Sequence, residues 1–139
     1  MDLHYEIPGD DLAHAGEASS NVKKILVQLG IDPVKVKKAA ISMYEAEINA
    51  VIHGGGGSAD VAIDSDKIII RIIDSGPGIE DLELAMQEGY TTASDEIREM
   101  GFGAGMGLPN MKRYADELDI QTAKDKGTVV TIVVYFHQQ

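Results

Sequence analysis

The chain has 139 residues, no cysteine and a formal net charge of −11, which fits one domain with its own core and excludes disulfides and thiolate metal sites. The acidic balance argues against a nucleic-acid partner, because phosphate binding needs a basic surface. No run of about 18 apolar residues and no secretion signal is found, so we expect a cytoplasmic protein with no membrane partner.

The first half of the chain predicts one strand and two helices. Leu3, Tyr5 and Ile7 alternate with polar residues and indicate a strand that ends at Pro8-Gly9. Residues 11–29 predict a helix stopped by Gly30. A second helix is predicted over about 33–52, with Asp32 as its N-cap and glycines 54–57 at its end. Its apolar stripe is Ile41, Tyr44, Ile48 and Val51, and its polar stripe is Ser42, Glu45, Asn49 and His53.

The second half adds two hairpins. Strands are predicted over 59–64 and 67–73, joined through Ser65-Asp66. A short helix near 80–87, an irregular segment over 88–106 and a helix over 108–117 follow. Strands over 118–124 and 128–136 flank the turn at 125–127. This order predicts one α+β domain over 1–139, a two-layer sandwich with a mixed sheet covered on one face by helices.

Glu45 and Asn49 lie four residues apart and therefore project from the same side of the second helix. An amide oxygen suits Mg²⁺, and a carboxylate one turn away can act as a base toward an attacking hydroxyl. Taken alone, the pair is more simply read as solvent-facing. Glu47 points away from Glu45 and is interpreted as a surface residue. For His53, capping of the helix C-terminus is favoured over contact with a nucleotide.

Asp74 follows the apolar run Ile68–Ile73 and opens the segment Asp74-Ser75-Gly76-Pro77-Gly78. A carboxylate at the end of such a strand can accept the adenine amino hydrogen, and Gly76 and Gly78 let the backbone approach a base. A plain turn is the alternative, since the segment is rich in turn-forming residues.

Glycines 101, 103, 105 and 107 alternate just before the helix that begins near Leu108. They free backbone N–H groups to surround phosphates at a helix N-terminus. The run fits neither the Walker pattern nor the dinucleotide fingerprint. Its position after Glu45, Asn49 and Asp74 makes the whole set indicative of ATP binding.

These segments resemble, in order, the sequence boxes of the GHKL ATPase superfamily, and most closely those of the small bacterial anti-sigma factor serine/threonine kinases. Residues 45–50 with His53-Gly54 resemble the N box, and residues 74–79 resemble the G1 box. Gly89-Tyr90-Thr91-Thr92 resembles the start of an ATP lid over 88–106. Residues 103–108 resemble the G2 box, and Gly127-Thr128 the final box near adenine.

The resemblance implies a Bergerat-type fold and assigns roles to residues. Glu45 would be the catalytic base and Asn49 the Mg²⁺ ligand, while Asp74 would read adenine and Gly105 and Gly107 would contact phosphates. The implied nucleotide-binding residues are Asn49, His53, Asp74, Gly76, Gly78, Ile79, Thr91, Gly103, Gly105, Met106, Gly107, Leu108 and Thr128.

The resemblance further implies an ATP–Mg²⁺-dependent serine/threonine kinase of a partner-switching system, acting on a STAS-type anti-anti-sigma protein. A sigma factor or other regulator is a second expected partner, and a homodimer is among the oligomeric states left open. A non-catalytic nucleotide-gated module and a detached histidine-kinase ATPase domain are the alternatives. Several anti-sigma kinases carry an arginine directly before the G2 glycines, where this chain has Phe102-Gly103.

Overall fold

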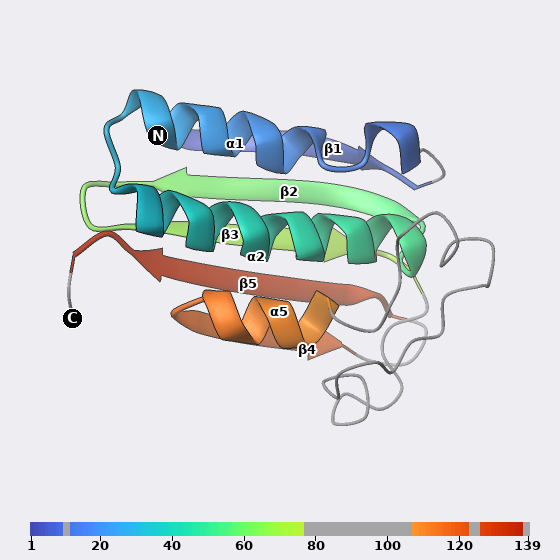
Figure 1. Ribbon diagram of the computed structural model, residues 1–139. Helices are drawn as coiled ribbons and strands as arrows, with labels where there is room; N and C mark the ends of the chain where they lie inside the picture. Colours follow the sequence, from blue (N-terminus) through green and yellow to red (C-terminus); the bar gives the residue numbers. More distant parts are fainter. Residues whose placement is uncertain (10–11, 77–106, 123–125, 138–139) are drawn as a thin grey trace.

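The structure, a computed structural model, describes residues 1–9, 12–76, 107–122 and 126–137. Within these residues, five strands form one sheet and three α-helices cover one of its faces (Figure 1). The strands are β1 (Asp2–Pro8), β2 (Gly56–Ile63), β3 (Lys67–Asp74), β4 (Glu117–Thr122) and β5 (Thr128–Tyr135). The helices are α1 (Glu17–Gln28), α2 (Pro33–Ile52) and α5 (Gly107–Tyr114), with a 3-10 turn, η1 (Leu12–His14), before α1.

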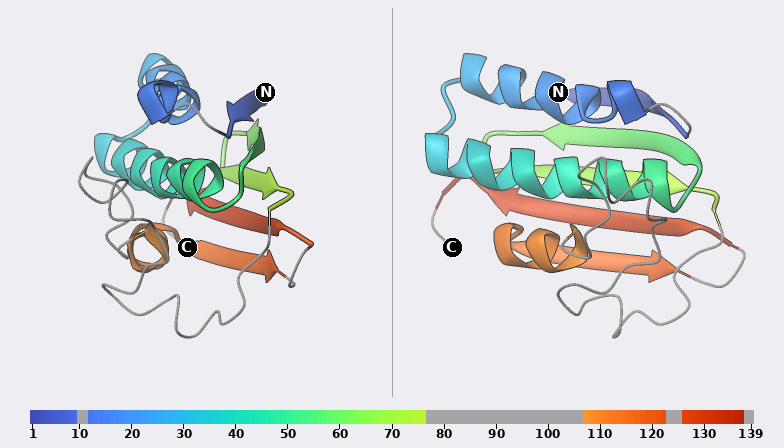
Figure 2. Two further views of the ribbon diagram at one scale, coloured as in Figure 1. Left: turned by 90° about the vertical axis from the view of Figure 1, so that its right-hand side faces the viewer. Right: turned by 45° about the vertical axis from the view of Figure 1, so that its right-hand side comes forward.

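The two layers are seen end-on in Figure 2, with the helices on one side and the sheet on the other. This confirms the predicted α+β sandwich with helices on one face. The strand order is β1-β2-β3-β5-β4, and every pairing between the described strands is antiparallel. The prediction of a mixed sheet was therefore wrong for these pairings. The reason is that β3 and β4 run in the same direction but are separated by β5, which returns from β4 as a hairpin.

The core lies between the sheet and the helices. Ile68, Ile70 and Ile72 of β3 face the helices together with alternate residues of β5, while the intervening residues of both strands are less buried. Alternation with a period of two places one set of side chains on the covered face. The turn between β2 and β3 was predicted correctly, and Asp64 Oδ1 accepts the N–H groups of Asp66 at 2.7 Å and Lys67 at 2.9 Å.

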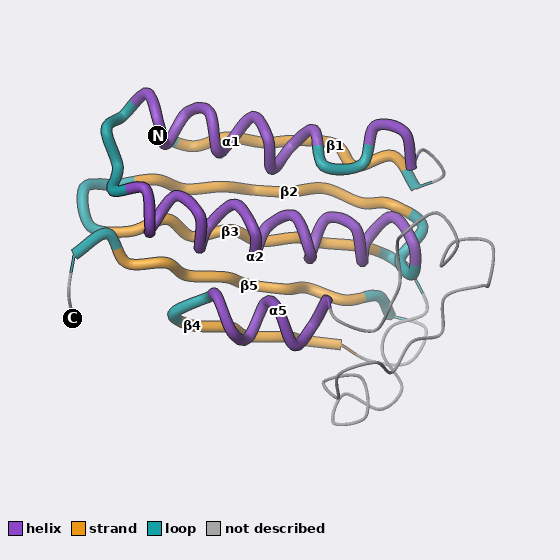
Figure 3. Tube along the Cα trace, in the orientation of Figure 1, coloured by secondary structure: helices purple, strands orange, loops and turns teal. Residues whose placement is uncertain are grey.

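Helix α2 has the bounds that the sequence predicted and runs between α1 and α5 over the sheet (Figure 3). Asp32 Oδ1 accepts the N–H of Val34 at 2.8 Å, as expected for the N-cap. The predicted apolar stripe was only partly right: Ile48 and Val51 are buried, but Tyr44 is 37% exposed. The buried residues of α2 are Val36, Ala39, Ser42, Met43, Ala46, Glu47, Ile48, Ala50 and Val51. Because α2 has neighbours on both sides as well as beneath, its buried arc is wider than a single stripe.

Other boundaries differ from the predictions by a few residues. The predicted helix over 11–29 is interrupted at Gly16, whose φ of 98° is left-handed, and Gly30 ends α1 with a φ of 76°. Of the glycines expected to end α2, Gly56 and Gly57 belong to β2. The predicted helix over 108–117 spans 107–114. The predicted helix near 80–87 and the lid over 88–106 lie outside the described residues. No helix in the described part of the chain is long and apolar enough to cross a membrane.

Candidate functional site

Asp74 is the last residue of β3, directly opposite Thr128 at the start of β5. Its Oδ1 accepts the N–H of Gly76 at 3.0 Å, and the backbone N–H of Thr128 also donates to the carboxylate. Partial burial raises the pKa of Asp74 above its ordinary value, while these two N–H groups and His53 act in the opposite direction. The result is a half-buried acceptor at the end of the central strand, held by backbone donors.

Two glycines allow the backbone to close around Asp74. A Cβ at Gly54 would lie 2.5 Å from Cγ of Asp74, and a Cβ at Gly76 would lie 2.6 Å from the Cα of Gly54. Either side chain would force the segments apart. Gly76 was predicted from its turn motif. Gly54 was not proposed as a site residue, although its position directly after His53 was a usable signal.

His53 closes α2 and lies near Asp74. It is the C-cap residue of the helix, and its N–H donates to the carbonyl oxygen of Asn49 at 2.9 Å, so the predicted capping position is confirmed. Burial lowers the pKa of His53 and the charge of Asp74 raises it, with burial the larger effect. A neutral imidazole therefore stands beside the Asp74 carboxylate at neutral pH.

Glu45 and Asn49 meet the first turn of α5. A Cβ added at Gly107 would lie 3.5 Å from both Glu45 Oε2 and Asn49 Oδ1. The predicted common orientation of the two side chains is thus observed, and they are half-buried rather than fully solvent-facing. Burial raises the pKa of Glu45, while a hydrogen bond from the Asn110 amide, at 3.4 Å to Oε1, lowers it.

Thr128 is the first residue of β5, and Leu108 lies in the first turn of α5. Thr128 is buried, and its hydroxyl is 3.0 Å from the hydroxyl of Thr122. Leu108 is 6% exposed and belongs to the hydrophobic core, so a nucleotide could meet its backbone but not its side chain. The remaining predicted site residues lie outside the described part of the chain: Gly78, Ile79, Thr91, Gly103, Gly105 and Met106.

Glu47 is not a surface residue, contrary to the prediction. It is 3% exposed, and its carboxylate accepts the N–H groups of Gly16 at 2.9 Å, Ser19 at 3.0 Å and Ala18 at 3.3 Å. These are the unpaired donors at the N-terminus of α1. Helical spacing correctly turned Glu47 away from Glu45, but the side it turns to is covered by α1. The sequence of α2 alone does not show that the free N–H groups of another helix will lie beside Glu47.

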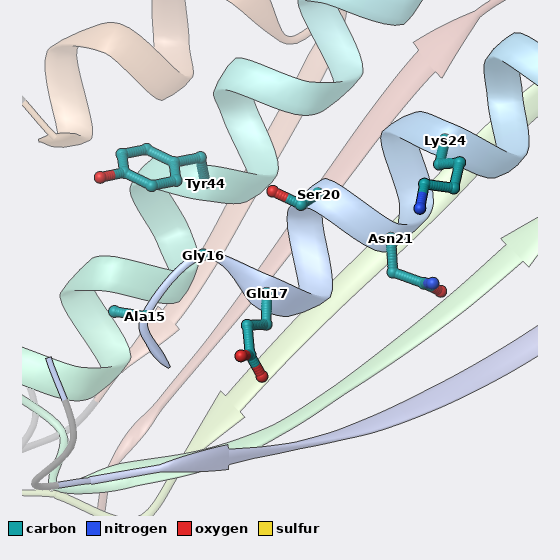
Figure 4. Close-up of a pocket in the computed structure, with 7 residues that line it drawn as sticks. All are labelled: Ala15, Gly16, Glu17, Ser20, Asn21, Lys24 and Tyr44. Atoms are coloured by element: carbon teal, nitrogen blue, oxygen red, sulfur yellow. The ribbon is translucent and has the colours of Figure 1, made fainter. Parts of the chain in front are cut away.

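A surface hollow of about 360 Å³ lies beside α1, with Tyr44 of α2 in its lining (Figure 4). It is lined by Ala15, Gly16, Glu17, Ser20, Asn21, Lys24 and Tyr44. None of these belongs to the set around Asp74, Glu45 and Asn49, so the hollow is separate from the candidate site. Within the described residues, no group of three or more histidines and carboxylates could hold a metal ion.

Comparisons with known proteins agree with the geometry. The protein-family model for histidine kinase-, DNA gyrase B-, and HSP90-like ATPases matches residues 40–138. An anti-sigma F factor of Thermoanaerobacter sp. (strain X514) is 38% identical over 110 residues, which are 76% of this chain and 72% of that protein. The serine/threonine-protein kinase RsbT of Bacillus subtilis (strain 168) is 28% identical over 127 residues, 88% of this chain and 87% of that protein.

Solved structures support the fold. The RsbU and RsbW domains of Rv1364c from Mycobacterium tuberculosis match with a TM-score of 0.68 at 17% identity, covering 100% of this chain and 33% of that one. The SiaB–SiaC complex from Pseudomonas aeruginosa matches with a TM-score of 0.61 at 13% identity, covering 95% of this chain and 88% of that one. The family match over 40–138 is more than half of the sequence, and this chain therefore belongs to the histidine kinase-, DNA gyrase B- and HSP90-like ATPases.

Proposed function

We propose that this protein is an ATP–Mg²⁺-dependent protein serine/threonine kinase of a partner-switching system, with a STAS-type anti-anti-sigma protein as its substrate. Its relatives are named anti-sigma F factor and serine/threonine-protein kinase. In this proposal it acts in the cytoplasm and also holds a sigma factor or another regulator. The proposal rests on one observation. Glu45 and Asn49 project from α2 toward the first turn of α5, and α2 itself ends beside Asp74.

The nucleotide would lie along the C-terminal half of α2. Asp74 would accept a hydrogen bond from the adenine amino group. Its half-buried carboxylate is a hydrogen-bond acceptor, so it favours a ligand group that donates over one that accepts. The close approach of Gly54 and Gly76 to each other and to Asp74 leaves no side chain between the backbone and the base. The N-terminal turn of α5 suits the phosphates, because its N–H groups and the helix dipole favour an anion.

The residues present fit Mg²⁺ as well. Asn49 Oδ1 is an oxygen donor of the kind that Mg²⁺ prefers, and it lies close to the first residue of α5, Gly107. Asn49 would hold the ion together with phosphate oxygens. A bound Mg²⁺ would supply neutralisation of the charge on the transferring phosphoryl group.

Glu45 would act as the general base. The acceptor hydroxyl oxygen attacks the γ-phosphorus as the bond to the ADP oxygen breaks, and the hydroxyl proton passes to Glu45. Burial raises the pKa of Glu45, which brings this base closer to the pH at which it must work. Its carboxylate is already turned toward the helix terminus at which the phosphates would lie.

The test is phosphoryl transfer from labelled ATP to a purified STAS-type protein. The variant Glu45→Gln keeps the shape of the side chain and removes the base, so we expect nearly normal ATP binding and transfer at least about 10²-fold slower. Asn49→Ala should weaken Mg²⁺-dependent binding and transfer together. Equal transfer rates for wild type and Glu45→Gln would contradict the assignment of Glu45.

We also propose that residues 88–106, including Thr91, form an ATP lid, and that residues 1–139 act as a single ATPase domain. Backbone amides in 88–106 should exchange with solvent faster without nucleotide than with an ATP analogue. Equal, strong protection in both states would contradict a lid.

The second candidate is a regulatory module that binds ATP without transferring its phosphate. It is favoured by the sequence Phe102-Gly103, at the place where several anti-sigma kinases have an arginine. ATP binding without transfer or hydrolysis in the presence of any STAS-type partner would select it. An acid-labile phosphohistidine product would instead favour a detached histidine-kinase ATPase domain.

A further inference from the structure

Asn110 lies in the first turn of α5 and reaches across to α2. Its amide nitrogen, Nδ2, donates to Oε1 of Glu45 at 3.4 Å, and the side chain is half-buried. The two residues are 65 positions apart in the sequence. Neither the glycine boxes nor the helical spacing of α2 draws attention to Asn110.

The chemistry of the two groups determines how they face each other. An ionised carboxylate only accepts hydrogen bonds, so the amide nitrogen and not the amide oxygen must point toward Glu45. A hydrogen bond to a charged acceptor is stronger than one between neutral groups. Because the carboxylate is partly buried, water cannot fully replace the Asn110 donor if that donor is removed.

The two oxygens of Glu45 have different surroundings. Oε1 accepts from Asn110, whereas Oε2 faces Gly107, where even a Cβ would stand 3.5 Å away. Asn49 Oδ1 is equally close to that position. Fixing Oε1 therefore aims Oε2 at the same space as the proposed Mg²⁺ ligand.

We propose that Asn110 is a positioning residue, which holds Oε1 of Glu45 so that Oε2 faces the reacting hydroxyl. This inference rests on the proposed kinase function. It assigns a role in that reaction to a residue outside the glycine run. Asn110 acts through Glu45 and needs no contact with ATP.

The kinetic test compares Asn110→Ala with Asn110→Gln and with Lys112→Ala, an exposed control on the same helix. Alanine favours helices, so the first variant is not expected to weaken α5. We expect Asn110→Ala to lower kcat for phosphoryl transfer about tenfold, the scale of a hydrogen bond to a charged group, with unchanged ATP affinity. Asn110→Gln, which keeps the donor, should recover part of the rate, and Lys112→Ala should match wild type.

The double variant separates positioning from a structural effect. If Asn110 acts only through Glu45, adding Asn110→Ala to Glu45→Gln should lower kcat little further, because residues that work as a unit are not additive. A full additional tenfold loss, or a loss that appears in ATP affinity, would overturn the inference.

A measurement that needs no phosphoryl transfer can test the contact between Asn110 and Glu45 independently of the proposed kinase function. In a ¹⁵N-labelled protein, the side-chain amide resonances of Asn110 should shift on Glu45→Gln and stay in place on Lys112→Ala. A shift in a protein that transfers no phosphate would support the contact and refute the kinase function. Unmoved resonances together with an unchanged rate in Asn110→Ala would refute the role of Asn110 and leave the kinase function standing.

Discussion

The carboxylate of Glu47 on α2 accepts the backbone N–H of Ser19 in α1 at 3.0 Å. It also accepts the N–H groups of Gly16 and Ala18, so one buried side chain satisfies most of the first turn of α1. Gly16 can enter this turn because its φ of 98° suits glycine. Since Glu47 lies between Glu45 and Asn49 in the sequence, the same helical turns carry the proposed catalytic residues and the attachment of α1.

The first prediction is that Glu47→Gln destabilises the protein by about 2 kcal/mol or more, because one amide oxygen cannot replace two carboxylate oxygens toward three donors. Urea unfolding followed by circular dichroism gives the free energy. Glu17→Gln is the matched control, a carboxylate at the same helix terminus but exposed, and should cost only about 0.5 kcal/mol. Equal losses for the two variants would show that the buried hydrogen bonds contribute little.

The second prediction concerns Gly54, where a Cβ would lie 2.5 Å from Cγ of Asp74. Gly54→Ala should displace Asp74, lower stability by about 1–3 kcal/mol and weaken ADP binding. Gly55→Asn is the control, since Gly55 has open space around it and a φ of 70° that asparagine tolerates. Unchanged ADP affinity in Gly54→Ala, measured by calorimetry, would contradict the proposed path of the nucleotide.

The sequence predicted well those features that depend on local spacing. Helix α2 was placed with its observed bounds because Asp32 and Pro33 mark its start and glycines follow its end. Asp74 was recognised because a carboxylate is unusual directly after a strand in which five of six residues are isoleucine. The relative orientation of Glu45 and Asn49 follows from the helical repeat alone.

The features that the sequence did not predict depend on contacts between distant segments. Glu47 was assigned to the surface because nothing in α2 indicates that α1 covers it. Asn110 was missed because its partner, Glu45, is on another helix. The sheet was expected to be mixed, although the intervening position of β5 makes each described pairing antiparallel. In each case the missing information is which elements become neighbours.

The third prediction is a pH dependence of stability at Asp116. Its Oδ1 accepts from the Lys38 ammonium group and its Oδ2 from the N–H of Tyr135 at 2.7 Å. Partial burial alone would raise the pKa of Asp116, but the Lys38 and Tyr135 hydrogen bonds outweigh it and hold the pKa below its ordinary 3.8. Ionised Asp116 therefore stabilises the fold above that pH, and the contribution is lost as the pH falls through the lower, folded-state pKa.

Urea unfolding of wild type and Asp116→Asn at several pH values tests this sign. The difference in unfolding free energy should be largest near pH 6 and should shrink below pH 3.8, where the unfolded chain takes up the proton. Asp119→Asn, a change at an exposed position on β4, controls for the loss of one negative charge. A difference for Asp116→Asn that stays constant with pH would show that the ion pair does not stabilise the fold.

The last prediction addresses base recognition by Asp74. While it is ionised, its carboxylate can only accept hydrogen bonds from a ligand. Adenine offers an amino group, which donates, at the position where guanine has a carbonyl oxygen, which accepts. Asp74→Asn introduces an amide that can turn its NH₂ outward, because Oδ1 is already engaged by the N–H of Gly76 at 3.0 Å. ADP affinity should then fall at least about tenfold, the consequence of losing a hydrogen bond to a charged group. GDP affinity should stay the same or rise, so the ratio of ADP affinity to GDP affinity should fall, as calorimetry with both nucleotides would show.

The control for this prediction is Asp119→Asn, which should leave both affinities unchanged. If Asp74→Asn kept the full preference for ADP, Asp74 would not be the residue that reads the base, and its role would be confined to closing the turn at Gly76.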